Sequence, residues 1–472
     1  MTERRERTYV KDLLEYAATL AGDYLDGVGT RHAGATASFG ECLDRLSRDL
    51  PEEGVGARVA LDVLVRGAEP GLVASAGPRY FGFVTGGSLP AALCADIMTS
   101  AWDQNAVLAV SSPAAAAAEE VAAGWILSLL GLPRGAGVGF VTGCQMANFT
   151  CLAAARHQVL RDVGWDVERK GLCGAPVVTV IAGREAHATL FAALRMLGLG
   201  QDTVRLADVD DQGRMLPGSL RELLSEISGP SIVCAQAGNV NSGAFDPLCE
   251  IVPAAKEHGC WVHVDGAFGL WAAASESMRA LTRGVDGADS WATDAHKWLN
   301  VPYDSGIAIV ANAAAHRASM TIEAPYYVRT PGEVREPNHW VPESSRRARA
   351  FPLYAALLSI GRRGVAELVG RNCRQARLMA ELLAAEDGIE IRNRVVLNQV
   401  VVRFLPQDRD ADAFTRKVVA AVQDEGTCWA GGTNWRGAAG MRISVSGWPT
   451  TDDDIRRSAS AIIGAFRRLR NG

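Results

Sequence analysis

Short runs of apolar residues alternate with helical patterns through the middle of this chain, from Pro78 to about residue 325. A run that is apolar along its whole length has no side for solvent, so it is typical of a strand in a parallel sheet that helices cover on both faces. The pattern therefore predicts an α/β fold with a mainly parallel sheet. The runs expected to form strands are residues 177–181, 232–235, 261–264 and 307–310.

The two ends of the chain have different patterns. Residues 8–66 have helical periodicity and predict an amino-terminal helical arm, and residues 346–385 predict a long helix. Residues 330–342 contain three prolines and many charges, which is typical of a long loop. Strands are expected after the long helix at 395–397, 400–402 and 441–445. The expected parts are a helical arm at 1–75, a large domain at 76–330, a mobile loop at 331–345 and a small α+β domain at 346–472.

Composition narrows the class of protein. The chain has 472 residues, of which 48% are hydrophobic and 21% charged, and its net charge is −5. This length favours a globular protein of roughly two or three domains, and the acidic balance argues against nucleic acid or an anionic membrane as a partner. Because the amino terminus alternates in charge and no apolar run reaches ~18 residues, we expect a cytoplasmic protein. The ten cysteines lack a CxxC pair or zinc-type spacing, so no metal is expected.

Lysine is scarce in this chain, and one lysine lies in an unusual context. Lys297 lies between apolar and aromatic residues, in the segment 290–298, whereas the others lie in polar surroundings. Burial there is expected to lower the pKa of the amine and make it a better nucleophile. Such an amine can form a Schiff base with an aldehyde. The five lysines are Lys11, Lys170, Lys256, Lys297 and Lys417.

A carboxylate precedes this lysine at the end of an expected strand. Asp265 follows the run 261–264 and lies 32 residues before Lys297 (297 − 265). Pyridoxal phosphate requires both groups, an amine for its aldehyde and a carboxylate that keeps its pyridine nitrogen protonated as an electron sink. The pair therefore predicts a pyridoxal phosphate site.

Three other places hold candidate site residues, and each has an ordinary structural alternative. The segment 139–148 places a glycine turn between a strand and a helix, which directs backbone N–H groups at an anion but occurs in many α/β proteins. His187 follows an expected strand, at the sheet edge where ligands collect, and His263 shares a strand face with Asp265. Either histidine can instead be a hydrogen-bonded core residue. The turn-rich segment 238–247 can line a pocket or satisfy its own backbone.

From Pro78 to the carboxy terminus, the chain resembles the group II pyridoxal phosphate decarboxylases, which include aromatic amino acid, glutamate and diaminobutyrate decarboxylases. The likeness is strongest at Asp265 and at His296-Lys297-Trp298. It implies the type I aminotransferase fold with a mainly parallel seven-stranded sheet, and a homodimer with shared active sites. The implied reaction is α-decarboxylation of an L-amino acid, whose amine displaces Lys297 from the cofactor.

The resemblance also implies roles for particular residues. Lys297 is expected to carry the cofactor aldehyde, Asp265 to face the pyridine nitrogen, Ala267 to pack beneath the ring and His187 to stack on its other face. The phosphate is expected near Gly143, Cys144, Gln145, Asp294 and His296. Substrate contacts are expected from Phe83, Thr85, Ser112 and Tyr327.

Two positions depart from the family's pattern. Gln145 stands where the family commonly has a small hydroxyl residue, so side-chain contacts to the phosphate are expected to differ. In the loop, His339 with its neighbouring tryptophan matches a His-Trp pair, and Pro337 stands where aromatic amino acid decarboxylases have a proton-donating tyrosine. The remaining candidate donors are His339, Tyr326 and Tyr327.

The departure at Pro337 keeps other activities open. One is decarboxylation coupled to oxidative deamination, which releases an aldehyde, and another is β-elimination on a modified amino acid such as an S-substituted cysteine in specialised metabolism. A third alternative is a protein that binds the cofactor without catalysis. Asp265 and Lys297 argue against it, because a purely structural ligand needs no electron sink.

Overall fold

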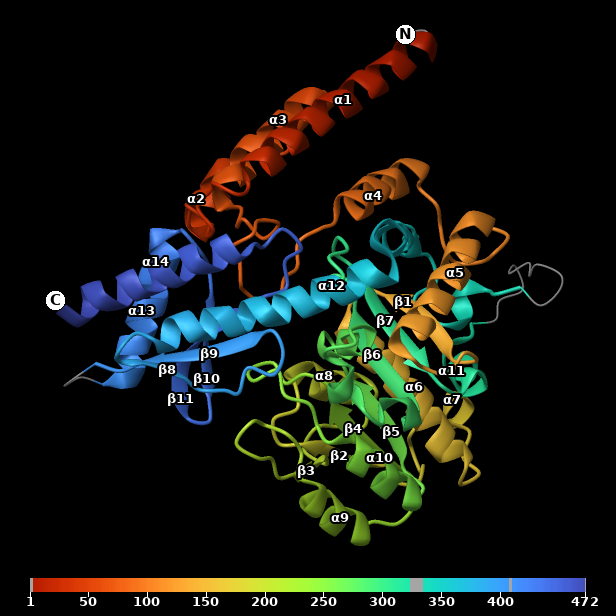
Figure 1. Cartoon of the computed structure of the whole chain (residues 1–472). Helices are drawn as coiled ribbons and strands as arrows, with labels where there is room; N and C mark the ends of the chain where they lie inside the picture. Colours follow the sequence, from red (N-terminus) through yellow and green to blue (C-terminus); the bar gives the residue numbers. More distant parts are fainter. Residues whose placement is uncertain (1–2, 323–333, 407–409, 472) are drawn as a thin grey trace.

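A seven-stranded sheet forms the centre of the larger part of the molecule in the computed structural model, which describes residues 3–322, 334–406 and 410–471 (Figure 1). Its strands are β1 (Gly137–Val141), β2 (Thr179–Gly183), β3 (Arg205–Ala207), β4 (Ser231–Gln236), β5 (Trp261–Asp265), β6 (Ser290–Asp294) and β7 (Gly306–Val310). Their order is β1-β7-β6-β5-β4-β2-β3. Strand β7 is antiparallel to both neighbours and the other pairs are parallel. This confirms the predicted α/β class with a mainly parallel sheet.

Alternate residues of the strands enter two different cores, one on each face of the sheet. In β4, Ile232 and Cys234 pack in the core that contains α6, α8 and α11, whereas Val233 and Ala235 pack in the core of the opposite face. Both faces therefore need apolar side chains, which explains the uninterrupted apolar runs. The helices of this part are α4 (Pro90–Trp102), α5 (Pro113–Leu130), α6 (Cys144–Arg161), α7 (Val167–Lys170), α8 (Ala188–Met196), α9 (Pro217–Ser225), α10 (Leu248–Glu257) and α11 (Ala313–Met320). Short 3-10 helices are η2 (Gly269–Ala274), η3 (Arg279–Thr282), η4 (Val285–Gly287) and η5 (Pro337–His339).

A second, antiparallel sheet lies toward the carboxy terminus, beside the long helix α12 (Ala350–Ala384) (Figure 1). Its strands are β8 (Ile389–Ile391), β9 (Gln399–Phe404), β10 (Gly431–Trp435) and β11 (Ala438–Ser444), in the order β10-β11-β9-β8. Helices α13 (Ala411–Glu425) and α14 (Asp452–Asn471) pack with it.

The strand predicted at 395–397 is wrong. These residues lie between β8 and β9, where Leu397 is fully buried and Val396 packs partly buried against the core of the large sheet. These residues are apolar because they pack the carboxy-terminal part of the chain against the core of the large sheet, and they do not pair within a sheet. The periodicity of three residues cannot distinguish these two uses.

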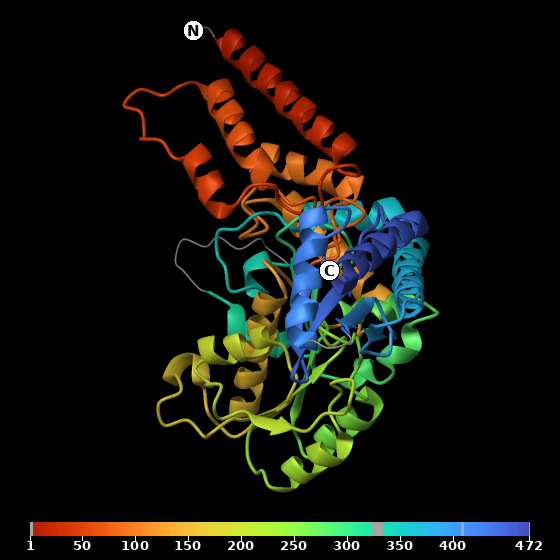
Figure 2. The same cartoon turned by 90° about the vertical axis from the view of Figure 1, so that its left-hand side faces the viewer.

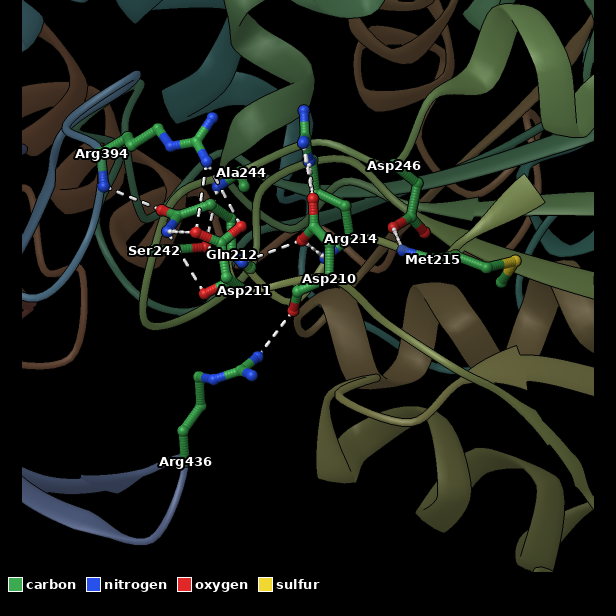
Figure 3. A network of polar contacts seen from close by, with 10 residues as sticks. All are labelled: Asp210, Asp211, Gln212, Arg214, Met215, Ser242, Ala244, Asp246, Arg394 and Arg436. Carbon is green, nitrogen blue, oxygen red and sulfur yellow. Dashed lines mark hydrogen bonds and ion pairs between the residues drawn. The ribbon is translucent and has the colours of Figure 1, made fainter. Parts of the chain in front are cut away.

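Polar contacts join the small sheet to the loop between β3 and α9 (Figure 3). Arg394, which lies between β8 and β9, places Nη2 3.2 Å from Asp211 Oδ2, and its backbone N donates to Gln212 Oε1. Arg436, between β10 and β11, donates from Nη1 to the carbonyl of Asp210. These contacts hold the β8–β9 connection and the β10–β11 hairpin against the loop between β3 and α9.

The amino-terminal helices project from the rest of the molecule (Figures 1 and 2). The helical pattern predicted for 8–66 is found as α1 (Glu3–Gly27), α2 (Phe39–Leu46) and α3 (Ala57–Ala68), followed by η1 (Glu69–Gly71). Tyr16 of α1 donates to Asp62 of α3. Both helices expose large apolar side chains, so this arm leaves apolar surface uncovered within one chain.

Within the described ranges, α5 alone has the length and apolar composition of a membrane-spanning helix. Half of that helix is buried inside the structure, and it packs against α12 and η2. It includes the alanine-rich stretch at 114–123. We therefore assign α5 as a core helix.

The described part of the expected loop, residues 334–345, packs on the large part of the molecule. His316 donates from Nε2 to the carbonyl of Trp340 at 3.0 Å, and Asn338 N donates to the carbonyl of Val107. Val341 is fully buried beside β1. The mobility expected for 331–345 stays a prediction.

Candidate active site

Lys297 lies in the turn that follows β6, and its amine faces a carboxylate. Its Nζ is 2.9 Å from Asp294 Oδ2, and 21% of the Lys297 side chain is exposed. Burial is the largest single influence and lowers the pKa of Lys297, but the charge and hydrogen bond of Asp294, together with Cys144 and Asp265, outweigh burial and the pKa is raised. The predicted lowering is therefore wrong for the protein chain alone, because the sequence did not show that Asp294 turns toward this amine.

Asp265 ends β5 at the carboxyl edge of the sheet, and neutral donors hold its carboxylate. Oδ1 accepts from the backbone N of Ala267 at 3.2 Å and from the thiol of Cys144 at 3.5 Å. Oδ2 accepts from Asn148 Nδ2 at 3.1 Å. Only 5% of Asp265 is exposed. The carboxylate is thus oriented by neutral groups, and its charge remains for a cation in the pocket.

The turn between β1 and α6 brings a helix amino terminus to the same place. Gly143 precedes α6 and provides no capping side chain, and the backbone N of Cys144 donates to Asp294 Oδ1 at 2.6 Å. A Cβ on Gly306 of β7 would lie 2.4 Å from the carbonyl carbon of Gly143, so the close approach of β7 to this turn requires glycine. Backbone N–H groups and the helix dipole make such a terminus suitable for an anion.

Asp294 contacts both the turn between β1 and α6 and the residues that follow β6, His296 and Lys297. Ser305 N donates to His296 Nδ1 at 3.1 Å, which leaves His296 Nε2, 3.4 Å from Asp294 Oδ1, to carry the proton. Burial raises the pKa of Asp294, but the charge of Lys297 and the hydrogen bond from His296 outweigh it and lower the pKa. Asp294 is therefore a buried anion with three donors, the backbone N of Cys144, His296 and Lys297.

His187 lies at the amino terminus of α8. Its Nδ1 accepts from the backbone N of Thr189 at 3.3 Å and lies 2.7 Å from Thr189 Oγ1. Burial lowers the pKa of His187, so the neutral ring is favoured. This arrangement orients the imidazole as a flat, uncharged surface beside the pocket.

A pocket of about 380 Å³ collects most of the residues expected from the sequence. The expected cofactor residues that line it are Gly143, Cys144, Gln145, His187, Asp265, Ala267, Asp294, His296 and Lys297. Phe83 lines it as well and remains 64% exposed. The expected cofactor residues come from the ends of β5 and β6 and from the segments that follow β1, β2, β5 and β6, at the edge where open α/β sheets bind ligands.

The other expected site residues lie elsewhere or are not described. Thr85 is buried next to the pocket-lining residues, where its backbone N donates to the carbonyl of Gly82. Ser112 is buried at the start of α5 and donates to Gln104 Oε1. His339 lies in η5, on the segment that packs against β1. Tyr326 and Tyr327 fall outside the described residues.

Several residues that line the pocket were not assigned to it from the sequence. Arg442 comes from β11 of the small sheet and Gln236 from the end of β4, whereas Val240 lies in the segment 238–247, for which lining a pocket is one of the two expectations. For Arg442 and Arg436 the sequence leaves two interpretations open, contact with a carboxylate and an ordinary surface or interface position. A pattern of alternation in β11 puts it on a strand, but only docking of the small sheet brings it to the pocket.

The residues present fit pyridoxal phosphate. The pocket offers an amine at Lys297, a buried carboxylate at Asp265, a flat neutral ring at His187 and a helix amino terminus at Cys144. These are the partners that an aldehyde, a pyridine nitrogen, an aromatic ring and a phosphate require. No group of three His, Cys, Asp or Glu side chains within the described ranges is placed to hold a metal ion.

Comparison with known proteins agrees with this geometry. The profile of the pyridoxal-dependent decarboxylase conserved domain matches residues 62–405. The chain belongs to this family. Its cofactor is pyridoxal 5'-phosphate, and it is a carboxy-lyase similar to the group II amino acid decarboxylases. The resemblance inferred from Asp265 and Lys297 is therefore confirmed.

Individual relatives are distant and cover nearly the whole chain. Aromatic-L-amino-acid decarboxylase from Bacillus atrophaeus is 24% identical over 454 residues, covering 93% of this chain and 92% of the relative. Phenylacetaldehyde synthase from Arabidopsis thaliana is 25% identical over 412 residues, covering 84% and 82%. The crystal structure of Oryza sativa TDC with PLP and tryptamine superposes with a TM-score of 0.91 at 23% identity, covering 100% of this chain and 99% of that one. This last likeness shows the fold.

Proposed function

We propose that this decarboxylase removes the α-carboxylate of an L-amino acid as carbon dioxide and releases the corresponding amine. The arrangement of charges in the pocket supports this most directly. Lys297, Asp265 and Arg442 line one cavity, and α6 begins at Cys144 in its wall. In this proposal Lys297 carries the cofactor aldehyde, Asp265 faces the ring nitrogen, His187 covers one ring face and the turn at Gly143–Gln145 holds the phosphate. Pyridoxal phosphate supplies the ring that accepts the electron pair left by carbon dioxide.

Arg442 is suited to bind the substrate's carboxylate. Its Nη1 donates to the carbonyl of Val240 at 3.3 Å, and no carboxylate among the described residues lies within ion-pair distance of it. Arg442 is partly buried, and this burial lowers the pKa of its guanidinium, which favours an incoming anion as its partner. The contact to Val240 orients the guanidinium relative to the turn after β4.

An aromatic wall borders the pocket beside Phe83. The rings of Phe83 and Trp429 stack at 5.6 Å, and those of Trp429 and Tyr80 at 5.0 Å. Phe83 and Val84 both have positive φ, 52° and 60°, a strained conformation for such residues that packing must maintain. We propose that this wall contacts the substrate side chain, in agreement with the sequence expectation for Phe83.

One experiment tests the reaction. Purified holoenzyme is incubated with a panel of aromatic, acidic and diamino L-amino acids while carbon dioxide, amine, dioxygen, ammonia and peroxide are measured. The expected result is one amine per carbon dioxide without dioxygen consumption. Lys297→Ala should lose both turnover and the visible absorbance of the lysine-bound cofactor. An unchanged spectrum in this variant would refute the assignment of Lys297.

A second candidate reaction is conversion of an amino acid to an aldehyde, and the same assays detect it. The similarity to phenylacetaldehyde synthase supports it. In that case one dioxygen is consumed, and ammonia, peroxide and aldehyde appear with each carbon dioxide. Pro337, which suggested this route, lies at the start of η5, outside the residues that line the pocket. Variants His339→Asn, Tyr326→Phe and Tyr327→Phe identify the proton donor by a lower ratio of amine to aldehyde. Elimination is recognised by release of a thiol with carbon dioxide absent.

We also propose that the enzyme is a cytoplasmic homodimer. The arm exposes apolar residues that one chain leaves uncovered, with Tyr9 46% and Leu14 54% exposed on α1, and Val59 50% and Leu64 57% exposed on α3. Exposed apolar area of this kind is typical of an interaction surface. A second copy of the chain is the occupant that the family resemblance implies.

A further inference from the structure

A buried line of hydrogen bonds leads away from Asp265, behind the pocket. Trp261 Nε1 lies 2.9 Å from Ser290 Oγ, and Ser290 Oγ lies 2.9 Å from His263 Nδ1. His263 Nε2 lies 2.9 Å from Asn148 Oδ1, and Asn148 Nδ2 lies 3.1 Å from Asp265 Oδ2. Ser290, His263 and Asn148 are fully buried. These four bonds form one continuous chain of side chains.

Secondary structure places these residues in line. Trp261, His263 and Asp265 alternate along β5 and therefore share a face. Ser290 of β6 lies directly opposite His263 in the strand register, and Asn148 lies on the second turn of α6, above the same face. Two strands and a helix thus converge on His263.

Only one direction of donation satisfies the whole chain. The indole N–H of Trp261 can only donate, so Ser290 accepts from it and gives its own hydrogen to His263 Nδ1. His263 must then carry its proton on Nε2 and donate to the oxygen of Asn148, which leaves the Asn148 amide nitrogen to donate to Asp265. In the opposite direction the oxygen of Asn148 would face the carboxylate of Asp265. Ser290 would accept from both Trp261 and His263, and its own hydrogen would have no acceptor among the described residues.

We propose that His263 is a positioning residue of the cofactor site, which acts through Asn148 to orient the Asp265 carboxylate as the acceptor for the pyridine nitrogen. This inference rests on the proposed role of Asp265. The remaining bonds to Asp265 come from Ala267 N and Cys144 Sγ, which are also neutral. Burial raises the pKa of the Cys144 thiol well above its usual value, so the thiol keeps its proton.

The neutral state of His263 matters because of charge. Burial lowers the pKa of His263 to about 4, so the ring carries no charge at neutral pH. A cationic histidine one residue away in the bond chain would partly neutralise Asp265 and weaken its hold on a protonated pyridine. A neutral histidine orients the carboxylate and leaves its charge to the cofactor.

The alternative is that His263 only fills the core, and binding measurements separate the two roles. His263→Leu should raise the dissociation constant for pyridoxal phosphate by about 10- to 100-fold. Without His263, Asn148 is no longer held, and its hydrogen bond to the charged Asp265 is disrupted. His263→Gln keeps a donor near Nε2 and should bind within about threefold of the wild type. The matched control is His316→Leu, because His316 is also fully buried with a pKa of about 4 but bonds to Trp340.

Each outcome decides between the two roles. Equal binding by His263→Leu and His316→Leu, or failure of His263→Gln to recover binding, overturns the inference. Asp265→Asn separates this failure from that of the proposed function: if it leaves binding and the cofactor spectrum unchanged, the role of Asp265 itself is wrong. If His263→Leu does not fold, neutron diffraction from the wild-type holoenzyme decides. A proton on His263 Nε2 with the Asn148 amide nitrogen toward Asp265 supports the inference, and a proton on Nδ1 overturns it.

Discussion

At the scale of single residues, the balance between burial and charge at Lys297 is the clearest test of the site. Burial lowers the pKa of this amine, and Asp294 at 2.9 Å is the largest of the neighbouring groups that together more than compensate. Asp294→Asn removes the charge and keeps the burial, so the pKa of Lys297 should fall below its wild-type value in cofactor-free protein. The measurement is the rate of acylation of Lys297 against pH, followed by mass spectrometry.

The scarcity of lysine makes this measurement simple. The other four lysines are internal standards in the same digest, and Asp289→Asn, which breaks the ion pair with Lys256, is the matched control. That control should leave the profile of Lys297 unchanged. An identical Lys297 profile in wild type and Asp294→Asn would show that the carboxylate does not set this pKa.

At the scale of elements, the close approach of β7 to the start of α6 is the feature that shapes the phosphate turn. A Cβ on Gly306 would meet the backbone of Gly143 at 2.4 Å, and neither backbone can move as a flexible side chain would. Gly306→Ala should cost about 1–3 kcal/mol of stability and weaken cofactor binding by displacing the turn. Urea unfolding and equilibrium dialysis of the cofactor measure the two effects.

The same substitution in an open place is the control for Gly306. Gly124 lies inside α5, and a Cβ there would meet nothing within 4 Å. Gly124→Ala should therefore leave cofactor binding unchanged and stabilise the helix by roughly 0.5–1 kcal/mol. Unchanged cofactor affinity in Gly306→Ala would contradict a role for this contact in the turn.

At the scale of the whole molecule, the arm provides the test of assembly. Leu14→Glu combined with Leu64→Glu places two charges on the exposed apolar faces of α1 and α3. The proposed dimer should therefore have a higher dissociation constant than the wild type and separate into monomers at a higher protein concentration. Sedimentation equilibrium measures this. Val177→Glu is the control, since Val177 is 80% exposed outside the arm. A wild type that is monomeric at micromolar concentration would remove the proposal.

Acid should destabilise the fold, because two histidines are buried in the neutral form. Burial lowers the pKa of His263 and of His316 to about 4, whereas the unfolded chain takes up protons near pH 6.5. The stability that each neutral histidine contributes is therefore fully present above about pH 6.5 and is lost as the pH falls toward about 4. The loss is on the order of 3 kcal/mol for each histidine. Asp246 has the opposite effect, since burial raises its pKa to about 6 and its protonation favours the folded state.

Unfolding by urea at pH 7.5 and at pH 4.5 measures the balance of these groups. The wild type should lose stability at the lower pH, because two histidines outweigh one carboxyl group of similar shift. His316→Leu should lose less than the wild type between the two pH values, although it starts from a lower stability. An equal loss in both proteins would mean that His316 does not contribute to the acid sensitivity.

The chain by itself determined the fold class, the cofactor and the central pair. Runs apolar on both faces specify strands between helical layers, and Lys297 and Asp265 stand out because their chemistry depends on residue type and local context. Tertiary structure alone decided which distant groups join them. Docking of the small sheet brings Arg442 to the pocket, and packing of α6 on β5 places Asn148 between His263 and Asp265. The end of β6 places Asp294 beside Lys297, where it and neighbouring groups reverse the expected pKa shift. These relations depend on distances between elements far apart in sequence, which periodicity and local composition do not encode.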